Sequence, residues 1–471
     1  MACGRACAAG CSIPSPPRPG MPTPTPARRW RSSSASPPAM PEVSGINVLV
    51  FPCGSEIGLE IHAALRHAKD VRLHGVSSVD DHGGFVYAHH RRIDAEARSP
   101  DFIEALNALI AEWGIDIVLP AHDDAIPVLA TAVAEGRLHA RAAVPDAETA
   151  AVCRDKRLTY ARLRHLGCVP AEVDADTGAY PIFAKPAIGQ GSQGAERVDD
   201  AARHAQLRAC GVDYVFSEYL PGQEYTVDCL SDADGRLLHS AARQRGRIKG
   251  GISVRTEAAA PDPRFAEIAG AIAAELRLKG AWFFQLRRDR HGTPKLLEVA
   301  PRIAGSMALA RMQGINHALL GTLAHLGSAF SVLPQQWPLV LDRALTNRYR
   351  PRLDYRQVYL DLDDTLIAGG KVNPWLMALL YQWRANGIPV TLLTRHAGDP
   401  CQTLAAHHVA CSLFAAIIHV TDGSPKSAAM DPAVPALFID DSYRERRDVH
   451  AAFGWPVLDV DAVEQLLDQR A

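Results

Sequence analysis

The sequence predicts a protein of several α/β and α+β domains, and three observations support this fold class. The chain has 471 residues, a length that holds about three domains. Short apolar strands alternate with helix-like stretches in its first and last parts, as in parallel α/β sheets. In the central part, strands and helices mix without this alternation. With 47% hydrophobic and 22% charged residues, the composition is that of an ordinary globular protein.

Composition divides the chain into segments. Residues 1–41 contain ten prolines and no acidic residue, so they cannot bury a core and are predicted to be disordered. An organelle transit peptide is a second interpretation of this tract, and Met40 is an alternative start. The predicted segments are an extension (1–43), an α/β domain (44–125), a central domain (126–335), a Pro/Arg-rich linker (336–356) and a second α/β domain (357–471).

The first domain is predicted from a strand–turn–helix order. An apolar strand at 46–51 precedes a Pro-Cys-Gly-Ser turn and a helix-like stretch at 56–67, and another buried strand follows at 115–120. Gly54 and Gly58 lack the full Gly-x-Gly-x-x-Gly pattern of dinucleotide-binding loops, so we interpret them as parts of a tight turn. The central domain is predicted to contain strands at 180–187, 215–220, 225–230, 282–287 and 295–299, and helices at 154–165 and 264–276.

Charge, hydropathy and cysteine usage exclude several classes of protein. The net charge is −2, which gives no electrostatic case for a nucleic-acid partner. No apolar run approaches the roughly 20 residues of a membrane span. The ten cysteines form no Cys-x-x-Cys pair, and those after residue 11 are interpreted as small buried hydrophobic residues of a cytoplasmic protein. Cys3, Cys7 and Cys11 recur at helical spacing, but their tract offers little else with which to build a metal site.

A glycine-rich loop follows a lysine in the central domain. The predicted strand at 180–187 carries Lys185, and the loop contains Gly191, Ser192 and Gly194. Glycines let backbone N–H groups approach phosphate oxygens, and a lysine adds a positive charge. A plain flexible hairpin explains such a loop equally well when it is considered alone.

Later residues favour a nucleotide site. Glu218 and Glu224 flank a turn between two strands, and Gln285 and Glu298 lie on two further strands, with Arg302 behind them. Carboxylate and carboxamide oxygens suit Mg²⁺, which shares its shell with phosphate and water. Arginine binds phosphate through two parallel hydrogen bonds.

This order of motifs over residues 46–330 resembles the ATP-grasp superfamily, most closely its carbamoyl phosphate synthase-like branch. The resemblance implies a pre-ATP-grasp α/β domain followed by an ATP-grasp fold that binds ATP and Mg²⁺, with Mn²⁺ as an alternative. It implies that Lys156 and Lys185 contact ATP and that Gly191, Ser192 and Gly194 cover the phosphates. Glu218 and Leu220 would line the adenine site, and Glu224 the ribose site. Gln285 and Glu298 would hold the metal, and Arg302 would stabilise the transferred phosphoryl group.

Two further features bear on this resemblance. The family commonly has Glu-x-Asn-Pro-Arg, whereas this chain has Ala300 in place of the metal-binding Asn, which leaves two-metal chemistry open. The basic segment 243–251 is either a solvated loop or a site for an acyl-phosphate or a substrate carboxylate, and its place between two nucleotide motifs favours the second. Enzymes of this kind phosphorylate a carboxylate with ATP and let an amine displace the phosphate. The chain has one such module and no glutaminase motif.

The last segment carries ordered acidic, hydroxyl and basic motifs. Asp361 and Asp363 follow an apolar strand at i and i+2, so they point to the same side. Thr394, Lys426 and the pair Asp440-Asp441 follow in order. We expect each motif to lie at the end of a parallel strand, where open α/β sheets bind ligands.

These motifs resemble the haloacid dehalogenase (HAD) superfamily over 357–471, which implies a capless Rossmannoid domain. The resemblance implies that Asp361 is the nucleophile and forms an aspartyl-phosphate, and that Asp363 is the general acid and base. It also implies that Thr394 and Lys426 bind phosphate oxygens. Mg²⁺ would be held by Asp361, the Asp363 carbonyl and Asp440, with Asp441 nearby. A degenerate copy without activity is the alternative.

The sequence therefore predicts a bifunctional biosynthetic enzyme, an ATP-dependent carboxylate–amine ligase joined to a phosphatase. Its partners would be a small-molecule carboxylate, an amine and a phosphorylated small molecule, and a homodimer is left open. One alternative is a phosphatase with an ATP-sensing front part, and another is a partner-binding protein without activity. Outside these motifs, His89-His90 and His407-His408 are interpreted as surface residues, and Trp375, Leu379 and Trp383 as the core face of a helix.

Overall fold

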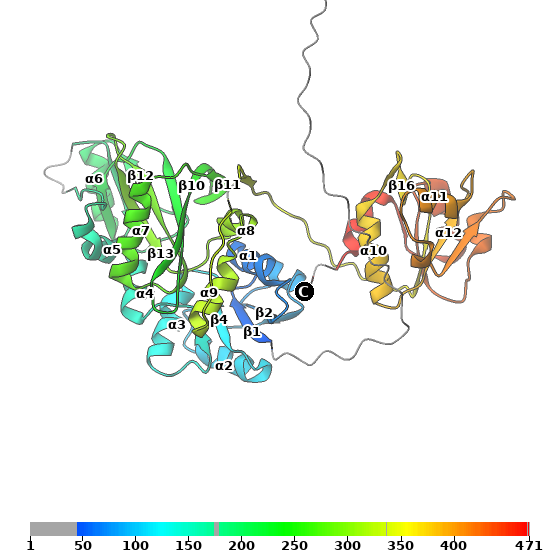
Figure 1. Cartoon of the computed structure of the whole chain (residues 1–471), viewed down its shortest axis with the longest axis horizontal. Coiled ribbons are helices and arrows are strands. Elements are labelled where there is room, and N and C mark those ends of the chain that lie inside the picture. The colour runs from blue at the N-terminus through cyan, green and yellow to red at the C-terminus, as the bar shows by residue number, and fades with distance from the viewer. Residues whose placement is uncertain (1–44, 174–178, 336, 469, 471) are drawn as a thin grey trace, which may run out of the picture. The chain divides into compact units, whose positions relative to one another are not determined.

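The computed structural model describes residues 45–173, 179–335, 337–468 and 470 (Figure 1). The extension predicted for 1–43, with Cys3, Cys7 and Cys11, lies outside the described residues. No helix in the described part of the chain has the length and apolar character to cross a bilayer.

The first sheet has five parallel strands in the order β3-β2-β1-β4-β5. Its first helix begins where the Ser55 hydroxyl accepts a hydrogen bond from the amide of Gly58, which satisfies a free donor of the first turn. The strands are β1 (Ile46–Phe51), β2 (Val71–Ser77), β3 (His89–Arg92), β4 (Ile117–Pro120) and β5 (Arg141–Ala142), and the helices are α1 (Glu56–Leu65), α2 (Phe102–Trp113) and α3 (Ala125–Ala134). Because β5 completes this sheet, the predicted boundary after residue 125 is too early.

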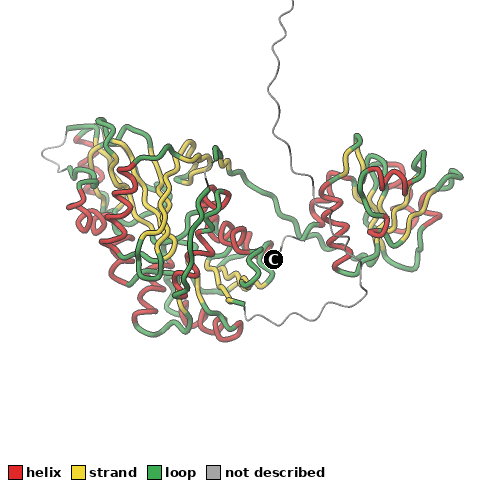
Figure 2. The backbone as a smooth tube through the Cα atoms, in the orientation of Figure 1, coloured by secondary structure: helices red, strands yellow, loops and turns green. Residues whose placement is uncertain are grey.

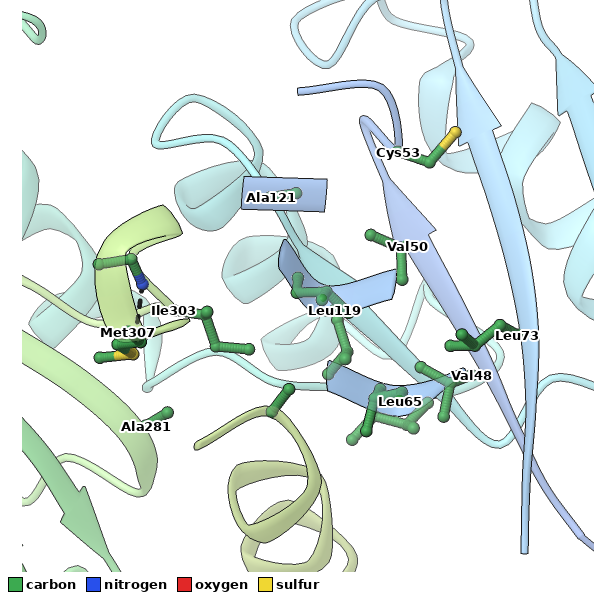
Figure 3. Packing of buried hydrophobic residues seen from close by; sticks show 14 of the residues in the cluster. Val48, Val50, Cys53, Leu65, Leu73, Leu119, Ala121, Ala281, Ile303 and Met307 are labelled. Atoms are coloured by element: carbon green, nitrogen blue, oxygen red, sulfur yellow. Dashed lines mark hydrogen bonds between the residues drawn. The ribbon is translucent and has the colours of Figure 1, made fainter. Parts of the chain in front are cut away.

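An apolar core joins this sheet to the central domain. Val48 and Val50 of β1 and Leu119 of β4 are buried in one cluster with Ala281 and Ile303 of the central domain (Figure 3). Helix α9 (His317–Leu326) contacts both β4 and a central strand, β12 (Gly280–Arg288). The two domains therefore share one core, which fixes the end of β4 beside the central domain.

The central domain contains two antiparallel sheets. Their strands are drawn in yellow in Figure 2. The small sheet has the order β7-β6-β8, and the large sheet has the order β13-β12-β9-β10-β11-β14. The strands are β6 (Ile182–Pro186), β7 (Glu196–Val198), β8 (Tyr214–Glu218), β9 (Glu224–Ser231), β10 (Leu237–Lys249), β11 (Ile252–Ala258), β12, β13 (Pro294–Ala300) and β14 (Val340–Asp342). The helices are α4 (Ala147–Arg154), α5 (Lys156–Leu163), α6 (Ala201–Ala209), α7 (Pro263–Leu276), α8 (Ala308–Met312) and α9.

The structure bears on three expectations for this region. The basic segment 243–251 is a hairpin rather than a loop, because β10 and β11 pair and turn at Gly250 and Gly251, both at positive φ. The helix predicted at 154–165 is confirmed as α5, which Asp155 caps, followed by a 3₁₀ turn at Arg164–Leu166, whereas Arg154 ends the preceding helix α4. The predicted linker begins too early, because β14 pairs with β11 in the large sheet.

The C-terminal domain is a five-stranded parallel sheet in the order β19-β18-β15-β20-β21. Leu379 and Trp383 are fully buried as expected, but Trp375 is 47% exposed, so the predicted core face of this helix is wrong in its first turn. The strands are β15 (Gln357–Leu360), β16 (Ile367–Ala368), β17 (Lys371–Val372), β18 (Val390–Thr394), β19 (Ala416–His419), β20 (Ala436–Ile439) and β21 (Val457–Leu458). The helices are α10 (Pro374–Ala385), α11 (Pro400–Ala406) and α12 (Tyr443–Phe453).

Short 3₁₀ helices complete the fold. They are η1 (His82–Phe85), η2 (Arg164–Leu166), η3 (Gly305–Met307), η4 (Cys411–Leu413), η5 (Lys426–Ala429) and η6 (Val460–Leu466). Between β15 and α10 the described chain contains only the short β16–β17 hairpin, so the sequence that separates Asp363 from Thr394 forms no cap domain.

Candidate active sites

One pocket gathers most residues that the sequence assigned to ATP, and both central sheets line it. Gly194 belongs to the same loop but is outside the pocket lining, and Arg302 lines an adjoining pocket. The predicted residues that line the first pocket are Lys156, Lys185, Gly191, Ser192, Glu218, Leu220, Glu224, Gln285 and Glu298. Two of them also stabilise the fold around the pocket. Glu218 accepts a hydrogen bond from the Ala171 amide at 2.9 Å, and the Leu220 side chain is buried.

Lys185 is buried near the end of β6, and its partners are uncharged. Its Nζ donates to the Tyr160 hydroxyl and, at 3.0 Å, to the carbonyl oxygen of Leu297. Burial, followed by the nearby charge of Lys156, lowers the pKa of Lys185 to about 7. An anion in this pocket would stabilise the charged ammonium. Tyr160, which no sequence motif indicated, lies one helical turn after Lys156 on the buried face of α5.

The glycine-rich loop is held by close backbone contacts. Gly191 and Ser192 adopt positive φ angles of 60° and 57°, which expose successive amides in a tight turn. The Nζ of Lys156 donates to the Gly189 carbonyl at 3.2 Å, and burial lowers the pKa of Lys156. A Cβ added to Gly251 would lie 2.1 Å from the carbonyl carbon of Gly191, so the tip of the β10–β11 hairpin touches this loop.

Arg245 connects several of the predicted nucleotide ligands. Its Nη1 donates to Glu224 at 2.5 Å and to Oε1 of Gln285 at 2.7 Å, and its Nη2 donates to the Gly251 carbonyl at 2.7 Å. The side chain is 7% exposed. The sequence singled out the basic segment but not this residue, whose role depends on β10 lying beside β9 and β9 beside β12.

Three comparisons with known proteins bear on this pocket. A family model described as "ATP-grasp in the biosynthetic pathway with Ter operon" matches residues 212–342. No curated protein is significantly similar in sequence. Among solved structures, N5-carboxyaminoimidazole synthetase from Staphylococcus aureus complexed with ADP is 14% identical, with a TM-score of 0.53, covering 64% of this chain and 82% of that chain.

Two further solved structures have the same fold. N5-carboxyaminoimidazole ribonucleotide synthetase from Thermotoga maritima is 15% identical, with a TM-score of 0.50, over 63% of this chain and 80% of that chain. The biotin carboxylase domain of 2-oxoglutarate carboxylase from Hydrogenobacter thermophilus, in complex with MgADP and bicarbonate, is 16% identical, with a TM-score of 0.50, over 61% and 71%. The chain contains an ATP-grasp fold.

The ATP-grasp pocket offers oxygen donors for a divalent cation. Gln285 and Glu298 are directly opposite each other on β12 and β13, so their side chains share a face. Glu298 makes no hydrogen bond or ion pair within the described ranges, whereas Oε1 of Gln285 also accepts from Arg245. A carboxamide oxygen has two lone pairs, so it can accept this bond and bind a cation. The donors therefore fit Mg²⁺, while Ala300 adds no side-chain oxygen.

An adjoining ATP-grasp pocket contains Arg302 paired with an aspartate of the first domain. Arg302 Nε and Nη2 donate to the two carboxylate oxygens of Asp123 at 2.6 and 2.8 Å. Burial opposes the ionisation of Asp123, but Arg302 outweighs it and holds the pKa of Asp123 below its usual value. The next residue, Asp124, accepts from Arg154 at 2.7 Å. Sequence analysis missed Asp123, although its place just after the buried strand β4 is a position typical of ligands.

A second site is built from the ends of the parallel strands in the C-terminal domain. Asp361 directly follows β15 and Asp440 directly follows β20. The Nζ of Lys426 donates to both carboxylates at 2.6 Å, and all three side chains are buried. Lys426 lies on η5 and not at a strand end, so that expectation is corrected. Burial raises the pKa of Asp361 to about 6, an effect that Lys426 opposes and Asp440 reinforces.

The remaining motif residues surround this cluster. Ligand oxygens of Asp361, Asp440 and Asp441 lie within 4.8 Å of one another, an all-oxygen set that fits Mg²⁺. Thr394 ends β18 and is fully buried, and its hydroxyl accepts from the His396 amide at 3.1 Å. The Asp363 side chain is 53% exposed and contacts His396, a residue that sequence analysis missed.

Proposed function

We propose that the chain is a bifunctional enzyme, an ATP-dependent carboxylate–amine ligase of the carbamoyl phosphate synthase-like branch joined to a HAD-type phosphatase. The observation that carries this proposal is the presence of two separate clusters. One combines phosphate-binding lysines with Gln285 and Glu298, and the other combines Asp361, Lys426 and Asp440. Its substrates would be a small carboxylate, an amine and a phosphomonoester.

In the ligase, the carboxylate oxygen attacks the γ-phosphorus of ATP, ADP leaves, and an amine then displaces phosphate from the acyl-phosphate. Lys185 and Lys156 bind phosphate oxygens, and the amides of the 189–194 loop add further donors. Glu298 and Gln285 would hold Mg²⁺, which neutralises phosphate charge when bound. Arg302 would stabilise the transferred phosphoryl group by turning some of its N–H donors from Asp123 to the phosphoryl oxygens.

In the phosphatase, an oxygen of Asp361 attacks phosphorus, and the bond from phosphorus to the leaving oxygen breaks. Asp363 gives that oxygen a proton. Water then attacks the phosphorus of the aspartyl-phosphate and returns a proton to Asp363. Phosphate is released, and the Asp361 carboxylate is free again. Lys426 and Thr394 bind the phosphoryl oxygens. Asp361, the Asp363 carbonyl and Asp440, with Asp441, would hold Mg²⁺, which offsets the charge of the phosphate and of the carboxylates.

A second candidate function is a phosphatase whose ATP-grasp part senses ATP without turnover. Two observations favour it: Ala300 removes a metal ligand common in the family, and Arg302 is already paired with Asp123. In that case ATP binds but no acid promotes ADP release.

Reciprocal substitutions in the full chain test the proposal. We expect Glu298→Gln to abolish ADP formation with a panel of amino acids and other carboxylates, while hydrolysis of p-nitrophenyl phosphate stays unchanged. Asp361→Asn should have the opposite effect. If either substitution abolishes both activities in a folded protein, the idea of two separate sites is wrong. If ATP binds and no acid yields ADP, the sensor is the better description.

A further inference from the structure

The exposed carboxylate of Asp363 has a partner that no sequence motif indicated. The Nδ1 of His396 lies 2.9 and 3.0 Å from the two carboxylate oxygens of Asp363. On the other side of the ring, Nε2 lies 2.7 Å from the hydroxyl of Thr403 on α11. His396 is 17% exposed at its side chain and Asp363 is 53% exposed. A nearly buried imidazole therefore holds a carboxylate that otherwise faces solvent.

The hydrogen-bond pattern fixes the ring of His396 from several sides. The Asp363 carboxylate oxygens can accept a hydrogen bond from Nδ1–H of His396, which leaves Nε2 to accept from the Thr403 hydroxyl. The backbone of the same residue is also held, since its amide donates to the Thr394 hydroxyl at 3.1 Å and its carbonyl oxygen lies 2.6 Å from Nε2 of His419. The groups of neighbouring elements that face this residue are thus Asp363, Thr394, Thr403 and His419.

We propose that His396 is a positioning residue that orients the Asp363 carboxylate for proton transfer, and that Thr403 holds the His396 ring. This inference rests on the proposed phosphatase function. Asp363 begins the reaction with a proton on one oxygen and accepts from His396 with the other. It gives this proton to the leaving oxygen as the phosphorus–oxygen bond breaks, and recovers one from the attacking water. His396 keeps its Nδ1 proton throughout, so it takes no part in the proton balance.

A partly exposed Asp–His pair without such a role would contribute little to stability. If His396 positions Asp363, its loss should instead lower the rate of the reaction. General acid catalysis contributes about 10²–10⁴-fold, and it matters most when the leaving oxygen is basic and needs a proton. A poorly oriented Asp363 therefore slows the hydrolysis of an alkyl phosphate far more than that of an activated aryl phosphate.

The test compares β-glycerophosphate with 2,4-dinitrophenyl phosphate in the full chain. For His396→Ala we expect kcat on the alkyl ester to fall about 10²-fold, with little change for the aryl ester or in KM. His396→Asn should recover most of the loss, because the Asn amide donates from nearly the position of Nδ1. Thr403→Val should show a smaller loss with the same substrate dependence. The control is His408→Asn at an exposed position of positive φ, which asparagine tolerates.

Nitrogen-15 spectra of histidine-labelled protein add a readout that is independent of activity. We expect the Nδ1–H tautomer for His396 in the wild type and its loss in Asp363→Ala. Equal losses on both esters, failure of asparagine to restore activity, or an Nε2–H tautomer in the wild type would overturn the positioning role while the phosphatase stands. A folded wild type that hydrolyses neither ester would overturn the phosphatase together with this inference.

Discussion

The two sites bury a lysine in opposite electrostatic settings. In the ATP-grasp pocket, Lys185 contacts a hydroxyl and a carbonyl, and burial lowers its pKa to about 7. In the C-terminal domain, Lys426 is buried between Asp361 and Asp440. Although burial opposes its charge, the two carboxylates raise the pKa of Lys426 above its usual value. Among the residues that the structure describes, Lys185 forms no ion pair, whereas Lys426 forms ion pairs with two carboxylates.

This difference indicates what each site is built to receive. An unpaired buried cation is stabilised by an incoming anion such as a phosphate group. A buried excess of carboxylates is stabilised by an incoming cation, and Asp361, Asp440 and Asp441 supply only oxygen ligands. The same substitution in the two sites should therefore have opposite effects on stability.

The largest effect is expected for Lys426→Met. Removing one partner of a buried ion pair leaves uncompensated charge and costs about 3–5 kcal/mol. We therefore expect a loss of this size in the free energy of unfolding, measured by urea denaturation of the C-terminal domain within the full chain, together with loss of phosphatase activity. Added Mg²⁺ should recover part of the stability. Lys371→Met, at an exposed position of β17, is the control, and equal effects of the two substitutions would contradict this account of Lys426.

Lys185→Met should give the opposite result for stability. Its ammonium forms no ion pair with a carboxylate of the described chain, and the Tyr160 hydroxyl can still donate to the Leu297 carbonyl, which is 3.2 Å away. Removing a buried unpaired charge should leave the free energy of unfolding unchanged or raise it by about 1 kcal/mol. ATP turnover should fall about 10²-fold, as expected when a phosphate-binding group is lost. A destabilisation as large as that of Lys426→Met would mean that Lys185 has an ionic partner.

Acid should also affect the two regions in opposite directions. Burial lowers the pKa of His62, His74 and His317 to about 4, and each has a ring nitrogen without a hydrogen-bond partner in the described chain. The unfolded chain takes up these protons near pH 6.5, so stability around these histidines falls as pH drops from about 6.5 to 4. Each group accounts for about 1.4 kcal/mol per pH unit at most.

The C-terminal domain should become more stable over the same interval. Asp361 has a pKa of about 6 in the folded state and about 3.9 when unfolded, so the folded state binds the proton more tightly. Its burial penalty is relieved as pH falls from about 6 to 4. Hydrogen exchange at pH 7.5 and 5.0, corrected for intrinsic rates, should show faster opening around His62, His74 and His317 and no such change at β15 and β20. A uniform change across both regions would contradict these assignments.

The sequence could predict those site residues that lie at the ends of strands. Asp361 and Asp440 directly follow strands of a parallel sheet, and strand order brings such positions to one edge whatever the side chains are. Lys185 was predicted for a similar reason, since it lies near the end of an apolar strand before a glycine-rich loop.

The residues that were missed depend on packing between elements. Asp123 meets Arg302 because the first sheet and the central domain share a core, and no local pattern reports that contact. Arg245 was not singled out within the basic segment 243–251, because its strand is polar and lacks the apolar alternation by which a strand is recognised. His396 lies just beyond the end of β18 and contacts Asp363 across the site. Trp375 is a different case: it has the helical spacing of a core residue but is exposed.

The smallest effect is expected where the two glycine-rich turns of the ATP-grasp pocket touch. Gly251→Ala places a methyl group 2.1 Å from the Gly191 carbonyl carbon and also strains a φ of 76°, which costs about 1–2 kcal/mol. We expect the hairpin tip to withdraw from the loop, with KM for ATP raised about tenfold and phosphatase activity unchanged. Gly292→Ala is the matched control, because it has a φ of 80° with nothing within 4 Å of the added carbon. If both substitutions raise KM equally, backbone strain is responsible; if only Gly251→Ala does, contact between the two turns is what shapes the phosphate site.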